Sequence, residues 1–314
     1  MASLDYPFAV VAVDVGGTKI ACATVRYDRE GDAPVVADKR TVPTEAALGG
    51  QAVLEKVLSL VDGQLRAVEE AGERIAGIGV STAGRVDART GNIAYANEIM
   101  PGWSGRPLGD ALRERFDARS AVLGDVQSHA LGEARWGAAR GARTAIVAAP
   151  GTGLGGGIIC HGRIVLGAHG FAGEIGAGPN PFDPDDGNLE SWAAGSGIES
   201  RYAAATGRRL SGAEISRLAN EEGDEQARAV LARAGKALGI ALAGWANMLD
   251  PEVCVVSGSV TKAGPIWRDS FVGTFRRRVP GVLSSMPIVD AELGPDAPLV
   301  GAAEHLVDSL AAGR

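Results

Sequence analysis

Two stretches of the chain follow one plan, and this repetition constrains the fold more than any other feature. Residues 8–15 are apolar and β-branched, which predicts a buried strand; a Gly-Gly turn follows, and residues 20–25 predict a second strand. Residues 144–149 also predict a strand, followed by a glycine-rich loop at 151–157 and a further strand from Ile158. We interpret these stretches as two copies of one unit, each opening a lobe, with a boundary near residue 122 and a cleft between the lobes.

Strands and helices alternate along the rest of the chain, which indicates the α/β class. Apolar residues at helical spacing predict helices at 51–70, 107–117, 127–139, 225–249 and about 300–312. Short apolar runs predict strands at 75–80, 121–123 and 253–256, and Pro, Gly and Asp predict a loop at 178–188. We expect one lobe of residues 1–122, joined by the C-terminal helix at about 300–314, and a second lobe of residues 123–299.

Charge and cysteine content exclude several kinds of partner. The 314 residues include 31 Lys+Arg and 38 Asp+Glu, a net charge of −7 that lacks the basic field used to bind nucleic acids. Cys22, Cys160 and Cys254 are far apart, so we expect buried thiols rather than disulfides or a zinc site. No basic leader precedes the first strand, and no apolar run reaches the roughly 18–20 residues of a membrane span. We therefore expect a cytoplasmic protein that binds neither nucleic acid nor membrane.

The motif DVGGTK, residues 14–19, begins at the end of the first predicted strand. Gly16 and Gly17 allow a tight turn and a close approach to a ligand, because neither carries a Cβ. Thr18 and Lys19 place a hydroxyl and a cation beside that turn, and Asp14 can accept hydrogen bonds from water bound to Mg²⁺. A plain hairpin turn with an exposed lysine is the alternative.

The second motif, GTGLGGG, spans residues 151–157. It contains G-x-G-x-x-G, but a dinucleotide-binding fold needs a helix directly afterwards and here a strand is predicted; a Walker loop is also absent. We expect a phosphate-binding hairpin at Gly151, Thr152 and Gly153 rather than a flexible linker, since backbone N–H groups can form an anion site. Two such hairpins, one per lobe, would hold a nucleotide, with Gly258 under its adenosine; a helix-capping turn is the alternative at Gly258.

Several acidic and polar residues suit a polyhydroxylated substrate. Asp125 follows a short strand and precedes a helix, a position from which a carboxylate can accept a proton from a hydroxyl that attacks phosphorus. A helix N-cap is the alternative. Glu174 and Glu190 can each accept two hydroxyl hydrogen bonds, although Glu190 is equally typical of a helix first turn. Residues 81–87 and Asn97 would add polar groups to the same cleft.

Four motifs together resemble the ROK family (repressor, open reading frame, kinase) over nearly the whole chain: DVGGTK, GTGLGGGIICHG, PGW at 101–103 and AGEIG at 172–176. The resemblance implies two α/β lobes of the actin-like, hexokinase-like (ribonuclease H-like) ATPase fold with a central cleft. It implies ATP with Mg²⁺, a sugar substrate and a homodimer. It also places Asp125 at the catalytic base, and Gly84, Asn97, Glu174 and Glu190 at positions that contact sugar.

The chain departs from the family pattern at several positions. Gly124 stands where an Asn usually precedes the base, and Ala177 stands where the family has a His that binds zinc and sugar. Residues 178–190 contain no Cys, so we expect no zinc. Arg85 resembles the N-acetylmannosamine kinases of the family, which favours an N-acylhexosamine, and we place both Arg85 and Gly124 at the sugar.

We therefore predict an ATP-dependent kinase that phosphorylates a hexose or N-acylhexosamine of glucose or N-acetylmannosamine type, at O6. A sugar-responsive repressor would need a helix-turn-helix ahead of the first motif, and the dozen or so residues before Asp14 are too few for one. A catalytically weak sugar-binding or regulatory member of the family is the remaining alternative, which Gly124 and Ala177 would allow.

Overall fold

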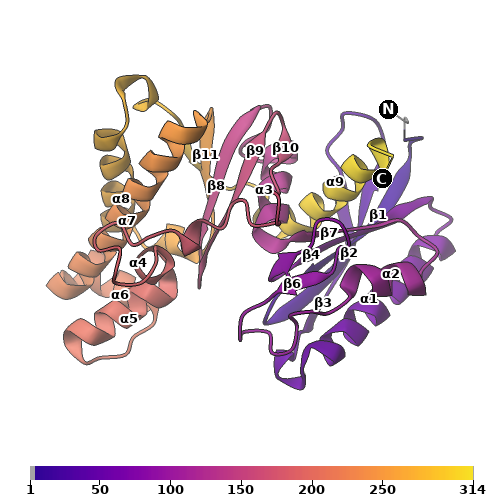
Figure 1. Ribbon diagram of the computed structural model, residues 1–314, viewed down its shortest axis with the longest axis horizontal. Helices are drawn as coiled ribbons and strands as arrows, with labels where there is room; N and C mark the ends of the chain where they lie inside the picture. Colours follow the sequence, from indigo (N-terminus) through magenta and orange to yellow (C-terminus); the bar gives the residue numbers. More distant parts are fainter. Residues whose placement is uncertain (1–3, 314) are drawn as a thin grey trace. The chain divides into compact units, whose positions relative to one another are not determined.

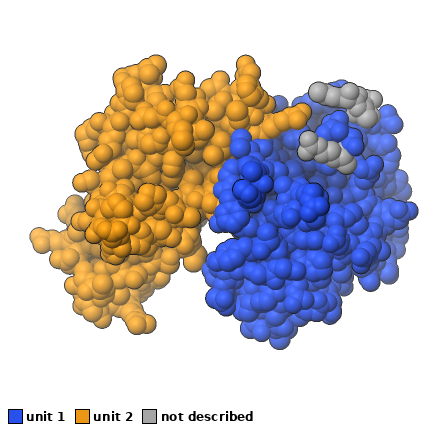
Figure 2. All heavy atoms as spheres, in the orientation of Figure 1, with its two compact units in different colours: residues 1–140, 164–172, 292–314 blue, residues 141–163, 173–291 orange. Residues whose placement is uncertain are grey.

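The computed structural model describes residues 4–313, which divide into two compact units (Figure 2). The first unit comprises residues 1–140, 164–172 and 292–314, and the second comprises residues 141–163 and 173–291. The lobe boundary near residue 122 stays a prediction. The first segment of the first compact unit ends at Arg140, and the second unit begins at Gly141.

The first unit is built on a five-stranded sheet. Its order is β3 (Val35–Pro43), β2 (Lys19–Tyr27), β1 (Phe8–Val15), β4 (Ile75–Thr82) and β7 (Ser120–Gly124). β1 and β2 form an antiparallel hairpin, whereas β1, β4 and β7 run parallel. The carboxyl ends of these three parallel strands therefore lie along one edge of the sheet.

Helices cover both faces of this sheet (Figure 1). α1 (Gly50–Glu70) and α2 (Leu108–Arg115) pack on one face, where Val11 and Val13 of β1 are fully buried. α9 (Ala297–Ala311) packs on the other face, against Val10 and Ala12. Because β1 is buried on both faces, almost all of its side chains are apolar, as the sequence predicted. The predicted helix at about 300–314 corresponds to α9, although Arg314 lies outside the described residues.

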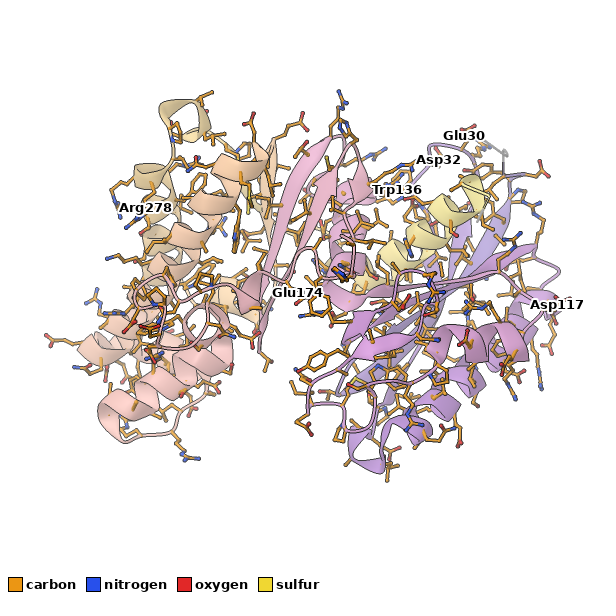
Figure 3. The ribbon with its side chains drawn as sticks, viewed as in Figure 1. Glu30, Asp32, Asp117, Trp136, Glu174 and Arg278 are labelled. Atoms are coloured by element: carbon orange, nitrogen blue, oxygen red, sulfur yellow. The ribbon has the colours of Figure 1, made fainter. Side chains whose placement is uncertain are left out.

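α3 (Asp125–Trp136) belongs to the first unit because it packs closely on α9. A Cβ added at Gly301 would lie 1.7 Å from the Ser128 carbonyl oxygen, and one at Gly132 would lie 2.4 Å from that of Ala297. Two glycines thus let the helix backbones touch. At the end of α3, Trp136 (labelled in Figure 3) donates to Glu304 Oε1 at 2.8 Å, which joins the same two helices.

The second unit repeats the sheet of the first. Its order is β10 (Arg163–Ile164), β9 (Leu154–Cys160), β8 (Thr144–Pro150), β11 (Val253–Val256) and β12 (Ile288–Asp290). β8 and β9 form an antiparallel hairpin, and β8, β11 and β12 run parallel. The predicted duplication is therefore confirmed in strand order and direction.

The helices of the second unit form its core with one face of the sheet. They are α4 (Glu190–Ala193), α5 (Gly195–Thr206), α6 (Gly212–Arg217), α7 (Glu225–Leu249) and α8 (Pro265–Arg278). Asp224 caps α7 by accepting from the Ala227 N–H at 2.8 Å, and Gly235 and Gly239 let α8 approach it closely. Within the described residues, α7 alone is long and apolar enough to cross a membrane, which the sequence prediction did not anticipate, but half of its apolar stretch is buried in this core.

Short elements complete the two units. The first unit adds β5 (Arg85–Val86), β6 (Ile93–Tyr95) and the 3₁₀ turns Ala46–Leu48 and Gly294–Asp296. The second adds the 3₁₀ turns Ile175–Ala177, Ser259–Lys262 and Gly281–Leu283, and a π-helical turn at Leu218–Glu222.

Two sequence predictions were wrong in detail. The second strand of the repeated hairpin begins at Leu154 and not at Ile158, because the glycines at 155–157 pair with β8 instead of forming a loop. Cys22 and Cys254 are buried as predicted, and burial raises the pKa of each thiol to about 12. Cys160 is exposed, because β9 ends there.

Candidate functional site

The predicted base and the predicted magnesium carboxylate lie at the same edge of the first sheet. β1 and β4 pair Asp14 with Ser81, and β4 and β7 pair Thr82 with Gly124, the residue before Asp125. The Ala83 N–H also donates to the Val15 carbonyl at 2.8 Å, just beyond the paired strand ends. Three neighbouring strand ends thus bring together residues that are more than a hundred positions apart in the chain.

Asp14 is half-buried and hydrogen-bonded at this edge. Ser81 Oγ donates to Asp14 Oδ1 at 2.7 Å. Burial raises the pKa of the Asp14 carboxyl above its ordinary value, while the Ser81 hydrogen bond and the charges of Lys19 and Lys39 partly oppose that shift. Ser81 therefore helps to keep this carboxylate ionised.

The DVGGTK motif forms the turn between β1 and β2. Its backbone is held by the Gly16 N–H, which donates to the Lys19 carbonyl at 3.0 Å, and by Thr44 Oγ1, which donates to the Gly16 carbonyl at 2.6 Å. A Cβ at Gly17 would lie 2.6 Å from Ile99 Cγ2, so Gly17 allows close contact with the side chain of Ile99 in the loop at 97–100. Thr18 and Lys19 are exposed. A phosphate-binding turn and a plain hairpin turn would both have this geometry. Phosphate binding by this motif therefore stays a prediction.

Asp125 is the first residue of α3 and is half-buried. The N-cap position itself is taken by Gly124, so Asp125 is not the N-cap; its Oδ1 accepts the Val126 N–H at 2.8 Å. A Cβ at Gly124 would lie 3.2 Å from Gln127 Oε1, a tight contact. Because Gly124 has no Cβ, it leaves room for Gln127.

Gln127 is a site residue that the sequence reasoning missed. Its side chain is buried, and Nε2 donates to the Ala172 carbonyl at 3.0 Å and to the Gly170 carbonyl at 3.4 Å. These bonds tie the segment leading to Glu174 onto α3, two residues after Asp125. The sequence offered one signal for this role, an amide side chain two residues after the predicted base. The carbonyl groups that Gln127 binds are more than forty residues away, so the sequence alone could not identify them.

Gly84 and the loop carrying Asn97 contact each other in the first unit. Gly84 has a φ of +94°, and a Cβ there would lie 2.6 Å from the Tyr95 carbonyl oxygen. Asn97 is exposed, and its Oδ1 accepts the Ile99 N–H at 3.2 Å. The loop is anchored by fully buried Trp103 of the PGW motif, whose Nε1 donates to Thr82 Oγ1 at 3.1 Å.

Arg85 lies at the start of β5, next to Gly84, and its guanidinium carbon lies 4.9 Å from the centre of the Phe171 ring. Phe171 is 50% exposed. Its neighbour Gly170 has a φ of +75°, and a Cβ there would lie 2.6 Å from the Val86 carbonyl oxygen. Half-buried Arg85 thus lies over the exposed ring of Phe171.

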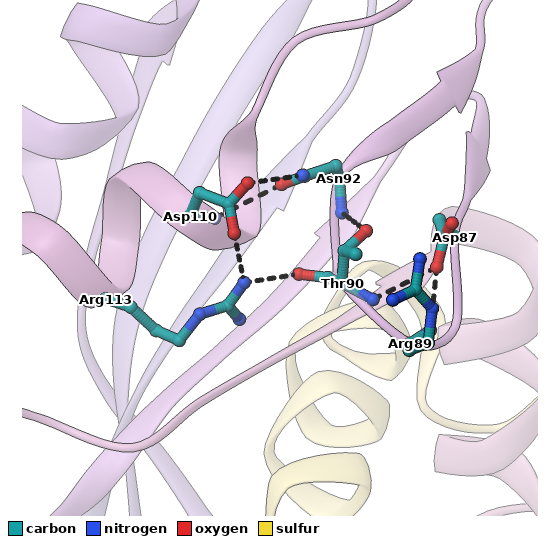
Figure 4. Close-up of polar contacts among 6 residues, drawn as sticks. All are labelled: Asp87, Arg89, Thr90, Asn92, Asp110 and Arg113. Atoms are coloured by element: carbon teal, nitrogen blue, oxygen red, sulfur yellow. Dashed lines mark hydrogen bonds and ion pairs between the residues drawn. The ribbon is translucent and has the colours of Figure 1, made fainter.

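A polar network orders the loop that follows β5 (Figure 4). Asp87 Oδ1 accepts the backbone N–H groups of Arg89 and Thr90, at 2.9 and 3.0 Å. Asn92 Nδ2 donates to Asp110 Oδ2 at 2.7 Å, and this bond is the main reason why the pKa of Asp110 lies below its ordinary value. The network connects the loop between β5 and β6 to α2, and so supports β5, which follows Gly84, and β6, which precedes Asn97.

In the second unit, the GTG motif forms the tight turn between β8 and β9. The Gly151 N–H donates to the Gly153 carbonyl at 2.8 Å. The start of α5 approaches from the other side: the Gly195 N–H donates to the Gly151 carbonyl at 2.8 Å, and Ser196 Oγ donates to the Thr152 carbonyl at 2.8 Å. The turn is therefore a fixed structure and not a flexible linker.

Glu190 contacts this turn directly. It is the first residue of α4, and its Oε2 accepts the Leu154 N–H at 2.7 Å. A Cβ at Gly153 would lie 2.7 Å from the same oxygen. Glu190 is thus both a first-turn acid and a residue that holds the glycine turn; sugar contact stays a prediction.

Gly258 and the AGEIG motif also border the β8–β9 hairpin. Gly258 has a φ of +86°, and a Cβ there would lie 2.4 Å from the Pro150 carbonyl oxygen. Cβ atoms at Gly173 and Gly176 would lie 2.6 Å from the Gly156 carbonyl oxygen and 2.2 Å from that of Leu154. Half-buried Glu174 lies between those two glycines (Figure 3). The packing of both glycines on β9 fixes the backbone on either side of it.

Each unit thus gathers part of the predicted site. The first unit holds Asp14, Gly16, Gly17, Thr18, Lys19, Gly84, Arg85, Asn97, Gly124 and Asp125. The second holds Gly151, Thr152, Gly153, Glu174, Glu190 and Gly258. Among the residues that the structure describes, no group of three or more His, Cys, Asp and Glu side chains is placed to hold a metal ion.

Two α/β units with the same strand order, each carrying a glycine turn at its central hairpin, define the class: the actin-like, two-lobed ATPase fold. A solved ROK family glucokinase from Streptomyces griseus, in complex with glucose and AMPPNP, matches this structure with a TM-score of 0.74 and 29% identity. The match covers 94% of this chain and 98% of that one.

The ROK family model matches residues 10–308, and the chain belongs to the ROK family. A glucokinase from Halalkalibacterium halodurans is 32% identical over 313 residues, which cover 93% of this chain and 92% of that protein. An N-acetylmannosamine kinase from Escherichia coli is 29% identical, covering 93% of this chain and 96% of that protein. These matches confirm the family and the fold expected from the sequence.

Proposed function

We propose that this protein is an ATP-dependent sugar kinase that phosphorylates a hexose or an N-acylhexosamine, at O6, with Asp125 as the base. Membership of the ROK family and the likeness to a glucokinase and to an N-acetylmannosamine kinase support the enzyme class. We further propose a homodimer and a cytoplasmic location, as the sequence predicts.

One observation carries the proposal: Asp14, near the end of β1, and Asp125, directly after β7, stand at one edge of the sheet with β4 between their strands. The carboxyl ends of parallel strands are where α/β proteins place reactive groups. Phosphoryl transfer needs a carboxylate for the attacking hydroxyl and another for the metal. A purely structural role would not require two half-buried carboxylates at this one sheet edge, where two strands that both pair with β4 end.

The residues present fit a magnesium nucleotide. The GTG turn is built for close approach: a Cβ at Gly151 would meet nothing within 4 Å, while Gly258 brings a second backbone segment against the turn. Asp14 offers a carboxylate whose orientation is fixed by Ser81. We propose that the turn would hold phosphate oxygens and that Asp14 would hold Mg²⁺ through water. When bound, the magnesium nucleotide supplies the phosphoryl group and neutralises its charge.

The chain's own residues would orient the sugar and take its proton. Asp125 would accept the proton of the attacking hydroxyl. Gly84 and the loop of Asn97 would bring backbone and amide groups to the sugar, and Glu174 and Glu190 would accept bonds from its hydroxyls. Gln127 would hold the segment before Glu174 in register with α3. These roles would raise the rate by positioning and by proton removal.

The Arg85–Phe171 pair bears on the choice of sugar. An aromatic ring with a guanidinium over it presents a flat apolar surface beside a positive charge. A planar N-acyl group would match such a surface better than a hydroxyl would. We therefore place N-acetylmannosamine beside glucose as the first substrates to test.

The test is a coupled assay of ADP formation with the purified chain and a panel of glucose, N-acetylglucosamine, N-acetylmannosamine, allose and fructose. Asp125→Asn should lower kcat by roughly 10²–10⁴-fold while sugar binding stays measurable by calorimetry. Asp117→Asn, at an exposed site in the same unit, is the matched control and should keep wild-type turnover. Near-normal turnover by Asp125→Asn would rule out this base. Sugar binding without phosphorylation of any sugar would favour the weak or regulatory alternative.

A further inference from the structure

The segment 178–189 has an ordered structure although it contains no helix and only one isolated β-bridge, between Pro179 and Asn188. Asn180, which is 1% exposed, supplies its internal bonds. Its Nδ2 donates to the Asp186 carbonyl at 2.8 Å, and its Oδ1 accepts the Phe182 N–H at 2.9 Å. These bonds shape the loop but do not attach it to the rest of the unit.

The attachment comes from a cluster of two rings and two guanidinium groups, Phe182, Trp192, Arg201 and Arg233, which we call the aromatic–arginine cluster. The guanidinium carbon of Arg201 lies 3.5 Å from the centre of the Trp192 ring, and that of Arg233 lies 4.7 Å from it. Phe182 meets Trp192 edge-on, with ring centres 5.1 Å apart. Both contacts are attractive, because cations and ring edges are drawn to the negative face of a ring.

The same two arginines hold the loop to two helices. Arg201, on α5, also pairs with Asp186 in the loop at 3.2 Å. Arg233, on α7, also lies over Phe182 in the loop, 4.4 Å from the ring centre. The loop is therefore fastened at Phe182 and Asp186, and α4 is fastened at Trp192.

Trp192 is two residues from Glu190 on the same short helix, α4. Glu190 is the residue whose Oε2 accepts the Leu154 N–H at 2.7 Å and lies against Gly153. Four residues are too few for a helix that is stable by itself, so α4 depends on tertiary contacts for its position. The aromatic–arginine cluster supplies such contacts directly beside Glu190.

We propose that Trp192 and Arg201 are positioning residues: they set α4 so that Glu190 holds the glycine turn 151–153. The kinetic consequence rests on the proposed kinase function, because it requires that turn to bind phosphate. The structural consequence does not, because the Leu154 N–H can be observed without nucleotide or sugar.

The structural test is amide hydrogen exchange at Leu154 in the full chain, with Arg201→Gln, Trp192→Ala and Trp192→Phe. We expect Arg201→Gln and Trp192→Ala to speed exchange at Leu154 by about tenfold, and Trp192→Phe, which keeps a ring, by much less. Asp186→Asn removes the ion pair but leaves the stacking, and should also have a small effect. Arg115→Gln is the matched control, because Arg115 also lies over a ring (Phe116, 5.9 Å) but in the first unit.

The kinetic test compares KM with kcat for the same variants. A displaced turn should raise the KM for ATP by about fivefold and change kcat less than about twofold, with Trp192→Phe restoring most of the loss. If Trp192→Ala fails to fold, the Leu154 exchange rate and the KM for ATP of Arg201→Gln decide whether the positioning role holds. Unchanged Leu154 exchange in folded Arg201→Gln would overturn the proposal. An inactive wild-type protein would instead refute the kinase function and leave the exchange result to decide the positioning role.

Discussion

Ser81 Oγ donates a hydrogen bond of 2.7 Å to Asp14 Oδ1, across the parallel pairing of β4 with β1. Ser81 is fully buried, so the bond is shielded from competing water. The bond opposes the rise in the Asp14 pKa that burial causes. The first prediction follows from this relationship.

Ser81→Ala should move the acid limb of kcat/KM to higher pH. The folded-state pKa of Asp14 is raised by burial, and the loss of the Ser81 donor would raise it further, so the ionised form would appear only at a higher pH. A pH profile of kcat/KM measures the shift. Ser284→Ala, which removes a comparable hydroxyl donor in the second unit, should leave the profile unchanged. An acid limb that stays in place in Ser81→Ala would show that Asp14 does not control it.

Gly258→Ala should weaken ATP binding more than it weakens the fold. Its backbone conformation (φ +86°, ψ 168°) costs any L-residue about 1–3 kcal/mol, and the added Cβ would also lie 2.4 Å from the Pro150 carbonyl oxygen beside the GTG turn. Gly49→Ala carries a similar backbone conformation (φ +92°, ψ 160°) with nothing within 4 Å, so it isolates the backbone strain from the clash. Calorimetry with a non-hydrolysable ATP analogue compares the two variants. Equal affinities would mean that the Gly258 contact has no part in the nucleotide site.

Gly301→Ala should separate α3 from α9 and lower the free energy of unfolding by about 3 kcal/mol, because the new Cβ would lie 1.7 Å from the Ser128 carbonyl oxygen. Gly244→Ala, on α7 with nothing within 4 Å, should instead raise stability by roughly 0.5–1 kcal/mol. Urea unfolding measures the free energy of unfolding of both variants, which should fall for Gly301→Ala and rise for Gly244→Ala. A neutral effect of Gly301→Ala would contradict the close helix packing.

Activity should require Mg²⁺ and not zinc. Residues 178–190 contain no Cys. The sequence also predicts, from its resemblance to the family, that Ala177 replaces a zinc-binding His. Treatment with a chelator should abolish phosphoryl transfer, and Mg²⁺ alone should restore it. Elemental analysis of the purified protein should find less than one zinc per ten chains; stoichiometric zinc, or recovery that depends on zinc, would contradict the prediction.

Local sequence patterns predicted most of the fold because they report burial and chain direction directly. The apolar, β-branched run from Phe8 to Val15 favours burial, and a glycine turn connects it to a second apolar run. The hairpin and its repeat could therefore be predicted from the sequence. The same patterns misjudged residues 155–157, because glycine has no side chain by which to show whether it lies in a loop or in a crowded strand. The contact of Gly156 with Gly173 explains why glycine is needed inside β9.

Site residues were predicted where the residue type and its local pattern indicate the chemistry. They were missed where the role depends on a hydrogen-bonding or stacking partner that is distant in the sequence. Asp14 lies at the end of a strand and Asp125 follows one, and both are acidic, which identifies them in any single sequence. Gln127 acquires its role only from the carbonyls of Gly170 and Ala172. Trp192 and Arg201 likewise read as an ordinary helix tryptophan and a surface arginine until their 3.5 Å contact is known.

The sequence by itself determined the α/β class, the duplicated hairpin with its two glycine turns, and the acidic residues that can serve a kinase. Only the tertiary structure decided that Ser81 supports Asp14, that Glu190 holds the GTG turn, and that a cluster of rings and arginines fastens the loop beside it. The physical reason is that apolar periodicity is a property of neighbours along the chain. A hydrogen bond or a stacked cation, by contrast, depends on distances that exist only after the strands and helices have packed.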